Sequence, residues 1–353
     1  MGLEFLQDHG GRRVRSYPDQ PELGLLKESP DGEEGPGVVG VDHDYEGRDW
    51  VPIGVEGAAV DWDEAPRRFV DGCHVGHTIA WLQDADGHPI PMMLSEIGGV
   101  CVERDGRDLR RSFQVVERVV SMIVDPFAWD EVEAFAVALA GSGFRLLPTS
   151  APRREDGPGW AASYDFEAMR KKTQNRSNYE MQVLEEVALC QHAEVPSLVD
   201  GPLEPRINSD ERLQRCPIVG VVKQQRKGYL HAQGWKAYYR LEPAQRTPAF
   251  LIETKGVPVV SWYLKLDGAH GALPNWGVVR VEVPRVYFEE RAGKDFALID
   301  RLSNALVQMR CRLGSYARGP VSLAPIVRAE EALRSLFAPP AQLAQQFYRM
   351  TGI

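Results

Sequence analysis

A single long helical pattern in the middle of the chain constrains the fold most. It covers about residues 163–193, is ended by Pro196, and leads into a short apolar strand, "SLVD". Four further runs then have the valine and aromatic content typical of strands: "CPIVGVVKQQ", "AFLIET", "VPVVSWYLKL" and "WGVVRVEVP". A long helix placed between strands predicts an α/β fold, with a mixed sheet flanked by helices.

Two strands precede this helix and helices end the chain. "RRFVDGCHVGHTIAWLQ" and "IPMMLSEIGGVCVE" are predicted to pair through a turn at "DADGHP". We expect a helical stretch at about 109–122 and another at "DEVEAFAVALAGSG", which Gly141 and Gly143 would end. Three helices are predicted at the C-terminus: "DFALIDRLSNALVQMRCRLG", "LAPIVRAEEALRSLF" and "PAQLAQQFYRMTG".

Composition divides the chain into three parts. Residues 1–66 are rich in glycine, proline and acidic residues, which predicts an N-terminal extension that is partly flexible, with a mobile loop at 27–37. Residues 67–335 hold the predicted strands and the long helix and form the main domain. Residues 336–353 are a C-terminal helical segment.

Charge and cysteine usage limit the class of protein. The net charge of −9 argues against a passive nucleic-acid coat, although an acidic metal site and basic surfaces can coexist in a nuclease. The five cysteines are scattered without a CxxC motif, which indicates a reduced, cytoplasmic protein. No apolar run is long enough to span a membrane, and no secretory signal or GxxxxGK[ST] phosphate-binding loop is present.

The tripeptide Val-Asp-Gly occurs twice, at residues 70–72 and 199–201. Asp-Gly is a common turn signal, so one interpretation is a pair of hairpin turns. The other is that Asp71 and Asp200 stand at the ends of buried strands and face a shared metal ion.

A glutamate on the long helix bears on this choice. On a helical wheel, one side collects the apolar residues Val183, Leu184, Val187, Ala188 and Cys190. Glu180 falls near the middle of this arc, whereas Glu185 falls on a flank expected to meet water. A buried, unpaired carboxylate is costly, so Glu180 needs an arginine, a raised pKa or a metal ion, unless it simply reaches solvent.

These three carboxylates can converge. Asp200 follows Glu180 by twenty residues (200 − 180), which lets the helix run back along the strand that it precedes. Asp71 joins them if its strand neighbours "SLVD". Three carboxylates at strand ends suit Mg²⁺ or Mn²⁺, which take hard oxygen ligands and leave positions for water and phosphate.

In order and spacing, "FVDG", the helix glutamate, "LVDGPL", "IVGVVKQQRKGYL", "SWYLKL" and "WGVVRVEVP" resemble the NurA nucleases over roughly residues 67–335. The resemblance implies an RNase H-like sheet and a Mn²⁺ or Mg²⁺ site formed by Asp71, Glu180 and Asp200, with Glu185 as the alternative glutamate. Lys223 is similar to the lysine expected near the scissile phosphate, and Tyr316 to a site tyrosine.

The resemblance has one departure. The family carries a histidine in its C-terminal "YPxPLxxAH"-like segment, whereas the last histidine of this chain is His270. Arg328 or Glu330 would stand in its place. His74 and His77, which follow Asp71, are expected to be ordinary solvated or hydrogen-bonded side chains.

The carboxylates and the resemblance together predict a metal-dependent DNA nuclease, and the resemblance implies single-strand endonuclease or 5′–3′ exonuclease activity. The resemblance implies a homodimer that acts with a HerA-like hexameric ATPase in DNA end processing, repair or phage defence. The alternative is a catalytically degenerate RNase H-like scaffold that binds nucleic acid or the ATPase.

Overall fold

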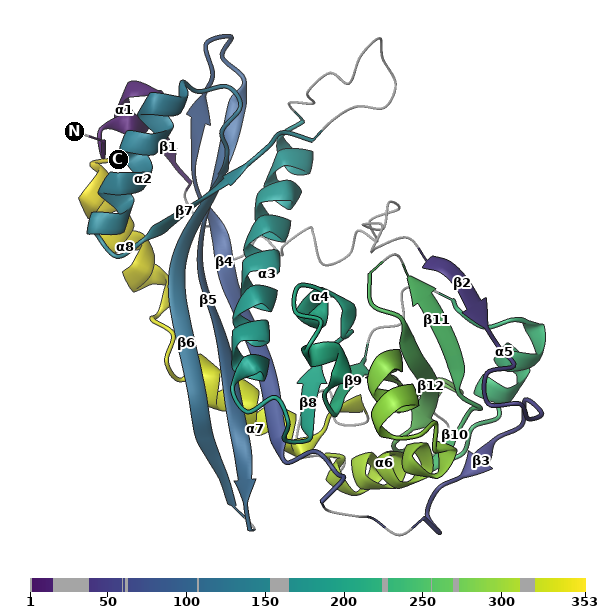
Figure 1. Cartoon of the computed structure of the whole chain (residues 1–353). Helices are drawn as coiled ribbons and strands as arrows, with labels where there is room; N and C mark the ends of the chain where they lie inside the picture. The colour runs from purple at the N-terminus through teal and green to yellow at the C-terminus, as the bar shows by residue number, and fades with distance from the viewer. Residues whose placement is uncertain are drawn as a thin grey trace.

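A computed structural model describes residues 2–14, 38–58, 60, 63–106, 108–152, 165–223, 228–254, 256–268, 273–311 and 321–353. Its centre is one mixed sheet in which ten strands follow one another in the order β2-β11-β12-β13-β9-β8-β4-β5-β6-β7 (Figure 1). Three short strands join this sheet from the side: β1 (Arg12–Arg13), β3 (Ile53–Gly54) and β10 (Gln245–Arg246). The expected loop at 27–37 lies outside the described residues.

Long antiparallel strands form one half of the sheet. They are β4 (Arg68–Gln83), β5 (Pro89–Asp105) and β6 (Asp108–Ile123), and β7 (Arg145–Thr149) adds a parallel edge. The predicted pairing of the first two strands is confirmed. The helix expected at 109–122 is wrong, because this segment is β6. The valines at 115, 116, 119 and 120 favour a strand, and pairing with the long β5 ladder outweighs the local helical pattern.

Two short parallel strands continue the sheet from β4. β8 (Ser197–Asp200) pairs with β4, and β9 (Ile218–Val222) pairs with β8. In the resulting run β6-β5-β4-β8-β9, β5 alone runs opposite to the other four. This order and these directions are those of an RNase H-like sheet, which confirms the predicted fold class.

Antiparallel strands complete the other half. β13 (Val278–Pro284) pairs with β9, followed by β12 (Val259–Lys265), β11 (Phe250–Thr254) and β2 (Val38–Asp42). Because β2 and β3 pair with β11 and β10, part of the N-terminal extension is built into the sheet.

Helices α3 (Phe166–Cys190) and α7 (Ala324–Arg334) cover opposite faces of the long strands. Adjacent glycines of β5 show this. A Cβ on Gly98 would contact Leu333 of α7, whereas one on Gly99 would meet the backbone of Leu184 on α3. Successive strand residues point to opposite faces, so the two helices sandwich the sheet.

Three helices pack together at the far end of the long strands (Figure 1). They are α1 (Phe5–Asp8), α2 (Trp129–Gly141) and α8 (Pro340–Thr351), and their core includes Phe5, Phe135 and Phe347. The remaining helices are α4 (Glu204–Ile207), α5 (Ala232–Tyr238), α6 (Phe296–Met309), a 3₁₀ turn at Leu213–Arg215 and a π-helical turn at Tyr287–Arg291. The predicted C-terminal helices are thus confirmed as α6, α7 and α8.

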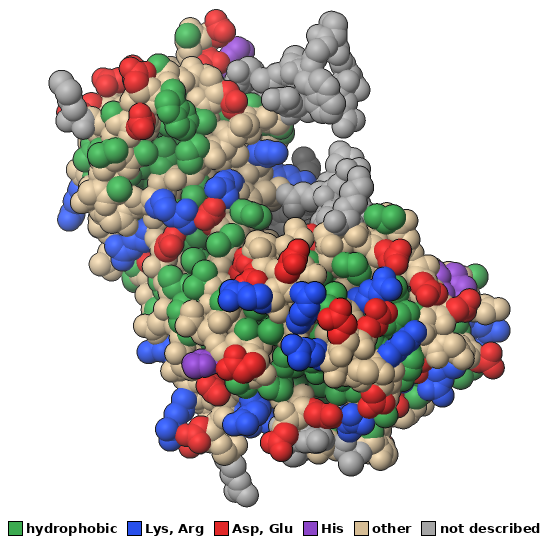
Figure 2. Space-filling model, viewed as in Figure 1, with side chains coloured by type: hydrophobic (Ala, Val, Ile, Leu, Met, Phe, Trp, Pro, Cys, Tyr) green, Lys and Arg blue, Asp and Glu red, His purple; other side chains and the backbone are tan. Residues whose placement is uncertain are grey.

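Charged side chains of both signs are interspersed on the face that Figure 2 shows, rather than gathered by sign. Each of the five cysteines is a free thiol. Within the described part of the chain, no helix combines the length and apolar character that crossing a membrane requires.

Candidate metal centre

Asp71 and Asp200 lie on neighbouring parallel strands. Val70 of β4 is in register with Val199 of β8, so the aspartate that follows each valine occupies the next position. Asp71 lies inside β4, whereas Asp200 is the last residue of β8. The first Val-Asp-Gly is therefore neither a turn nor a strand end, and the second ends a strand.

Strand alternation places both aspartates on the face that α7 covers. Phe69 and Cys73, two residues either side of Asp71, pack in one cluster with Ile326 and Leu333 of α7. Leu198, two residues before Asp200, belongs to the same cluster. Asp71 is 6% exposed, so burial removes most of its hydration.

Lys223 lies beside Asp200, where β9 ends. Asp200 is in register with Val221 of β9, and Lys223, two residues further, points to the same face. Its Nζ is 2.7 Å from Asp200 Oδ2. The predicted lysine is therefore next to one of the two aspartates.

Glu185 reaches the site from α3, on the opposite face. It is 1% exposed and lies against Gly72, where a Cβ would come within 2.8 Å of the Glu185 Cδ. A glycine after Asp71 is thus needed for the carboxylate to approach the strand backbone. Glu185 pairs with the equally buried Arg206, with Arg206 Nε 2.8 Å from Oε2.

Glu180 lies elsewhere on α3. Its carboxylate pairs with Arg145 of β7 at 2.9 Å and with Arg176 at 2.6 Å. The prediction that Glu185 meets water is wrong, because the buried face of the helix was identified from its apolar residues alone. Small polar residues, Thr173 and Ser177, also face the sheet, and Val187, which the wheel turned inward, is 40% exposed.

Asp71 has an unfavourable environment as a carboxylate. Burial raises its pKa well above the ordinary value, and the nearby charges of Asp200 and Glu185 raise it further, against the opposing effect of Lys223. Burial likewise raises the pKa of Glu185, and Arg206 opposes that effect. Asp71 makes no ion pair with any described residue. Its sole hydrogen bond within that part of the chain comes from the N–H of Gly72, at 3.0 Å.

These residues fit a divalent cation. Three carboxylates supply the hard oxygen ligands that Mg²⁺ and Mn²⁺ prefer, and Asp71 is buried without an ion-pair partner among the described residues. Their ligand atoms are not all within 4.8 Å of one another.

The C-terminal part of the predicted site is only partly described. Tyr316 lies outside the described residues. Glu330 is on α7, where its charge contributes to the raised pKa of Asp71, and it pairs with Arg334 at 3.0 Å. α7 therefore brings a further carboxylate near Asp71. Arg328 pairs instead with Glu331.

Of the two histidines after Asp71, His74 is held against α3. The ring of His74 forms hydrogen bonds with Asn178 Oδ1 of α3 at 2.6 Å and with Ser95 Oγ of β5 at 2.9 Å. Burial lowers the pKa of both His74 and His77. His74 is the hydrogen-bonded histidine that the sequence predicted.

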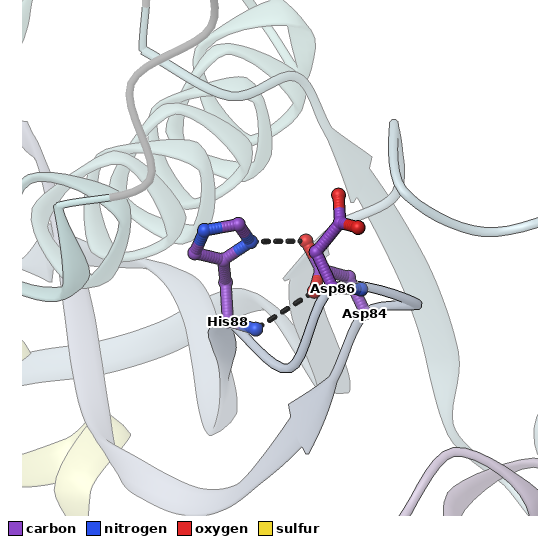
Figure 3. Close-up of side chains that lie close together, drawn as sticks. All are labelled: Asp84, Asp86 and His88. Atoms are coloured by element: carbon purple, nitrogen blue, oxygen red, sulfur yellow. Dashed lines mark hydrogen bonds and ion pairs between the residues drawn. The ribbon is translucent and has the colours of Figure 1, made fainter.

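A second acidic group lies in the turn between β4 and β5, where Asp84, Asp86 and His88 bring their ligand atoms within 4.8 Å of one another (Figure 3). The turn itself explains this arrangement. Asp84 Oδ1 accepts the backbone N–H groups of Asp86 and His88, and Asp84 Oδ2 lies 2.8 Å from His88 Nδ1. Such contacts are usual for an aspartate that closes a tight turn, and we assign no metal to them.

No family model matches the chain, and no curated protein matches it. Among solved structures it is similar to the crystal structure of the NurA nuclease from Sulfolobus solfataricus, with 12% identity over 88% of each chain and a TM-score of 0.43. A likeness at this level supports no argument about activity, which has to be made from the residues of this chain.

Proposed function

We propose that the protein is a metal-dependent phosphodiester hydrolase acting on DNA, of the kind that the NurA resemblance implies. One observation carries the proposal. On an RNase H-like sheet, Asp71 is a buried carboxylate without an ion-pair partner among the described residues, and the charges of Asp200 and Glu185 both raise its pKa. A site that gathers three carboxylates, one of which has no ion-pair partner in the described part of the chain, is suited to hold a divalent cation.

Each residue has a distinct role in this proposal. Asp71, Asp200 and Glu185 hold Mn²⁺ or Mg²⁺, with Glu185 in the role that the wheel gave to Glu180. When bound, the metal supplies an activated water and stabilises the leaving oxygen. Lys223, at the end of β9, turns from Asp200 to the scissile phosphate and neutralises its charge.

Asp200→Ala is expected to abolish Mn²⁺-dependent degradation of single-stranded DNA while the protein still folds. The two glutamates of α3 provide a matched pair. Glu185→Gln is expected to lower the rate by at least about 100-fold because a ligand is lost, whereas Glu180→Gln removes only a partly exposed ion pair. Nuclease assays of the purified variants, with circular dichroism to verify folding, measure this. Full activity in Asp200→Ala, or equal losses in both glutamine variants, would contradict the assignment.

A catalytically degenerate scaffold is the second candidate, and specific contacts favour it. Lys223 and Arg206 already form ion pairs with Asp200 and Glu185, and the chain has no histidine after His270. A scaffold has no need of a metal ion. Titration calorimetry with Mn²⁺ separates the two functions, because heat of binding in the wild type that is lost in Asp71→Asn supports the nuclease.

We further propose that the protein acts as a homodimer with a HerA-like hexameric ATPase. The family resemblance alone motivates this proposal. An ATPase would supply the unwinding that a chain without a phosphate-binding loop lacks. Gel filtration of the two purified proteins, alone and mixed, tests it, and a monomer that does not co-elute with the ATPase would refute it.

A further inference from the structure

Arg206 stands out because it is a buried arginine, 5% exposed, at the point where β8 and α3 meet. It belongs to α4, six residues after Asp200. Its guanidinium contacts two structural elements at once, although it lies on neither of them.

On one side Arg206 holds the carboxylate of Glu185. Arg206 Nε is 2.8 Å from Glu185 Oε2, and Nη2 is 3.2 Å from Oε1. The hydrogen bond from Nη2 and the close ion-pair contact of Nε together hold the carboxylate beside the guanidinium.

On the other side Arg206 holds the backbone that leaves β8. Its Nη2 donates to the carbonyl of Asp200 at 3.0 Å, and its Nη1 to the carbonyl of Pro202 at 2.8 Å. Gly201, with a φ of +123°, passes directly over the guanidinium, and a Cβ there would lie 3.0 Å from both terminal nitrogens. The Asp-Gly-Pro turn is therefore shaped to receive this side chain.

We propose that Arg206 is a positioning residue that fixes Glu185 of α3 relative to the backbone of Asp200, and so sets the separation of two metal ligands. This inference rests on the proposed function. An ionised carboxylate has about four lone-pair sites, so Glu185 can keep Arg206 as a partner while it binds an ion. Outer partners of this kind typically change metal affinity by about 10–100-fold.

The test compares Arg206→Met and Arg206→Lys with Arg212→Met. Arg212 is a suitable control because it follows closely in sequence and forms an ion pair with Asp210, but its side chain is 85% exposed. Mn²⁺ affinity is measured by titration calorimetry on the folded protein, and thermal unfolding is measured without metal. A purely structural role would lower the melting temperature and leave the Mn²⁺ affinity of the folded fraction unchanged.

We expect Arg206→Met to bind Mn²⁺ about 10–100-fold more weakly than the wild type, and Arg212→Met to bind it equally well. Arg206→Lys keeps a positive charge beside Glu185 but lacks the planar guanidinium that contacts Glu185, Asp200 and Pro202 together. It is therefore expected to fold and to bind Mn²⁺ with intermediate affinity. It keeps the test decisive if the methionine variant does not fold. Wild-type Mn²⁺ affinity in the folded Arg206 variants would overturn this inference and leave the proposed function standing. A wild type that binds no Mn²⁺ would overturn both.

Discussion

At the scale of single residues, the site is a balance of buried charges. Asp200 and Glu185 each have a positively charged side chain within 2.8 Å. Asp71 accepts a single hydrogen bond, from a backbone N–H, in the described part of the chain. Such an arrangement weakens the fold at the place where a cation would bind. Stability lost at a functional site in this way is usual for residues that serve chemistry rather than packing.

Asp71→Asn is expected to stabilise the metal-free protein in a pH-dependent way. An unfolded aspartate ionises near pH 3.9, and the pKa of Asp71 is higher than that in the folded protein. As the pH rises above about 4, Asp71 loses its proton in the unfolded state but keeps it in the folded state. The free energy of unfolding therefore falls with rising pH, until the pH passes the folded pKa of Asp71. Asparagine cannot ionise.

Thermal unfolding in the presence of a chelator, from pH 3 to pH 8, measures the effect. The variant is expected to match the wild type near pH 3 and to melt higher at pH 7, by roughly 2–4 °C for each kcal/mol gained. The exposed Asp86→Asn is the control. A difference between Asp71→Asn and the wild type that does not change with pH would contradict the explanation.

At the scale of elements, α3 packs directly against the backbone of two strands of the sheet. Glycines at 72 and 99 face it on neighbouring strands, in register with each other. The helix can approach because neither strand presents a side chain there. This contact places Glu185 against β4. The position of this proposed metal ligand therefore depends on Gly72 and Gly99 having no side chains.

Gly99→Ala is expected to destabilise the protein by about 1–3 kcal/mol, because its Cβ would lie 2.7 Å from the carbonyl oxygen of Leu184, in the helix backbone. It should also weaken Mn²⁺ binding, since α3 must move outward. Gly141→Ala, at the end of α2, has open space around its Cβ and is expected to be neutral or slightly stabilising. Chemical denaturation and calorimetry measure both effects, and a Gly99→Ala protein as stable as the wild type would refute this account of the packing.

Much of the fold was predictable from the sequence, and the exceptions have physical causes. Strands rich in valine, the long helix and the C-terminal helices were predicted because each shows its own periodicity. The strand at 108–123 was not, since its pairing with β5 is a long-range contact that no local pattern records. Asp71 and Asp200 were expected together because of the two Val-Asp-Gly tripeptides, although Asp71 lies inside its strand, and Lys223 was expected from the family resemblance. Arg206 was missed because nothing in a single sequence indicates which carboxylate a distant arginine will meet.

At the scale of the whole molecule, the buried apolar residues of the described chain form four clusters around the sheet. The far end, with α1, α2 and α8, has its own apolar core, whereas Asp71 and Asp200 adjoin the packing around α7 and β8. The chain termini meet in that far region, where Gln7 donates to the carbonyl of Thr351. The metal site and the terminal core can therefore be perturbed separately.

Phe347→Ala is expected to cost about 3–5 kcal/mol, because Phe347 is fully buried between α8 and the sheet. Its Mn²⁺ affinity should remain that of the wild type at temperatures where it is folded. Gln345→Ala, two residues earlier on the exposed side of α8, is the control for stability. Denaturation and calorimetry provide both values, and weakened Mn²⁺ binding in folded Phe347→Ala would show that the two regions are coupled.

The short strand β8 has a mechanical consequence. In the described chain, this four-residue strand is what connects the long antiparallel ladder to the other half of the sheet, through three residue pairs with β4. This join has far fewer residue pairs than the β4–β5 ladder beside it. Asp71 and Asp200 stand on its two sides, so any hinge motion between the halves changes their spacing directly.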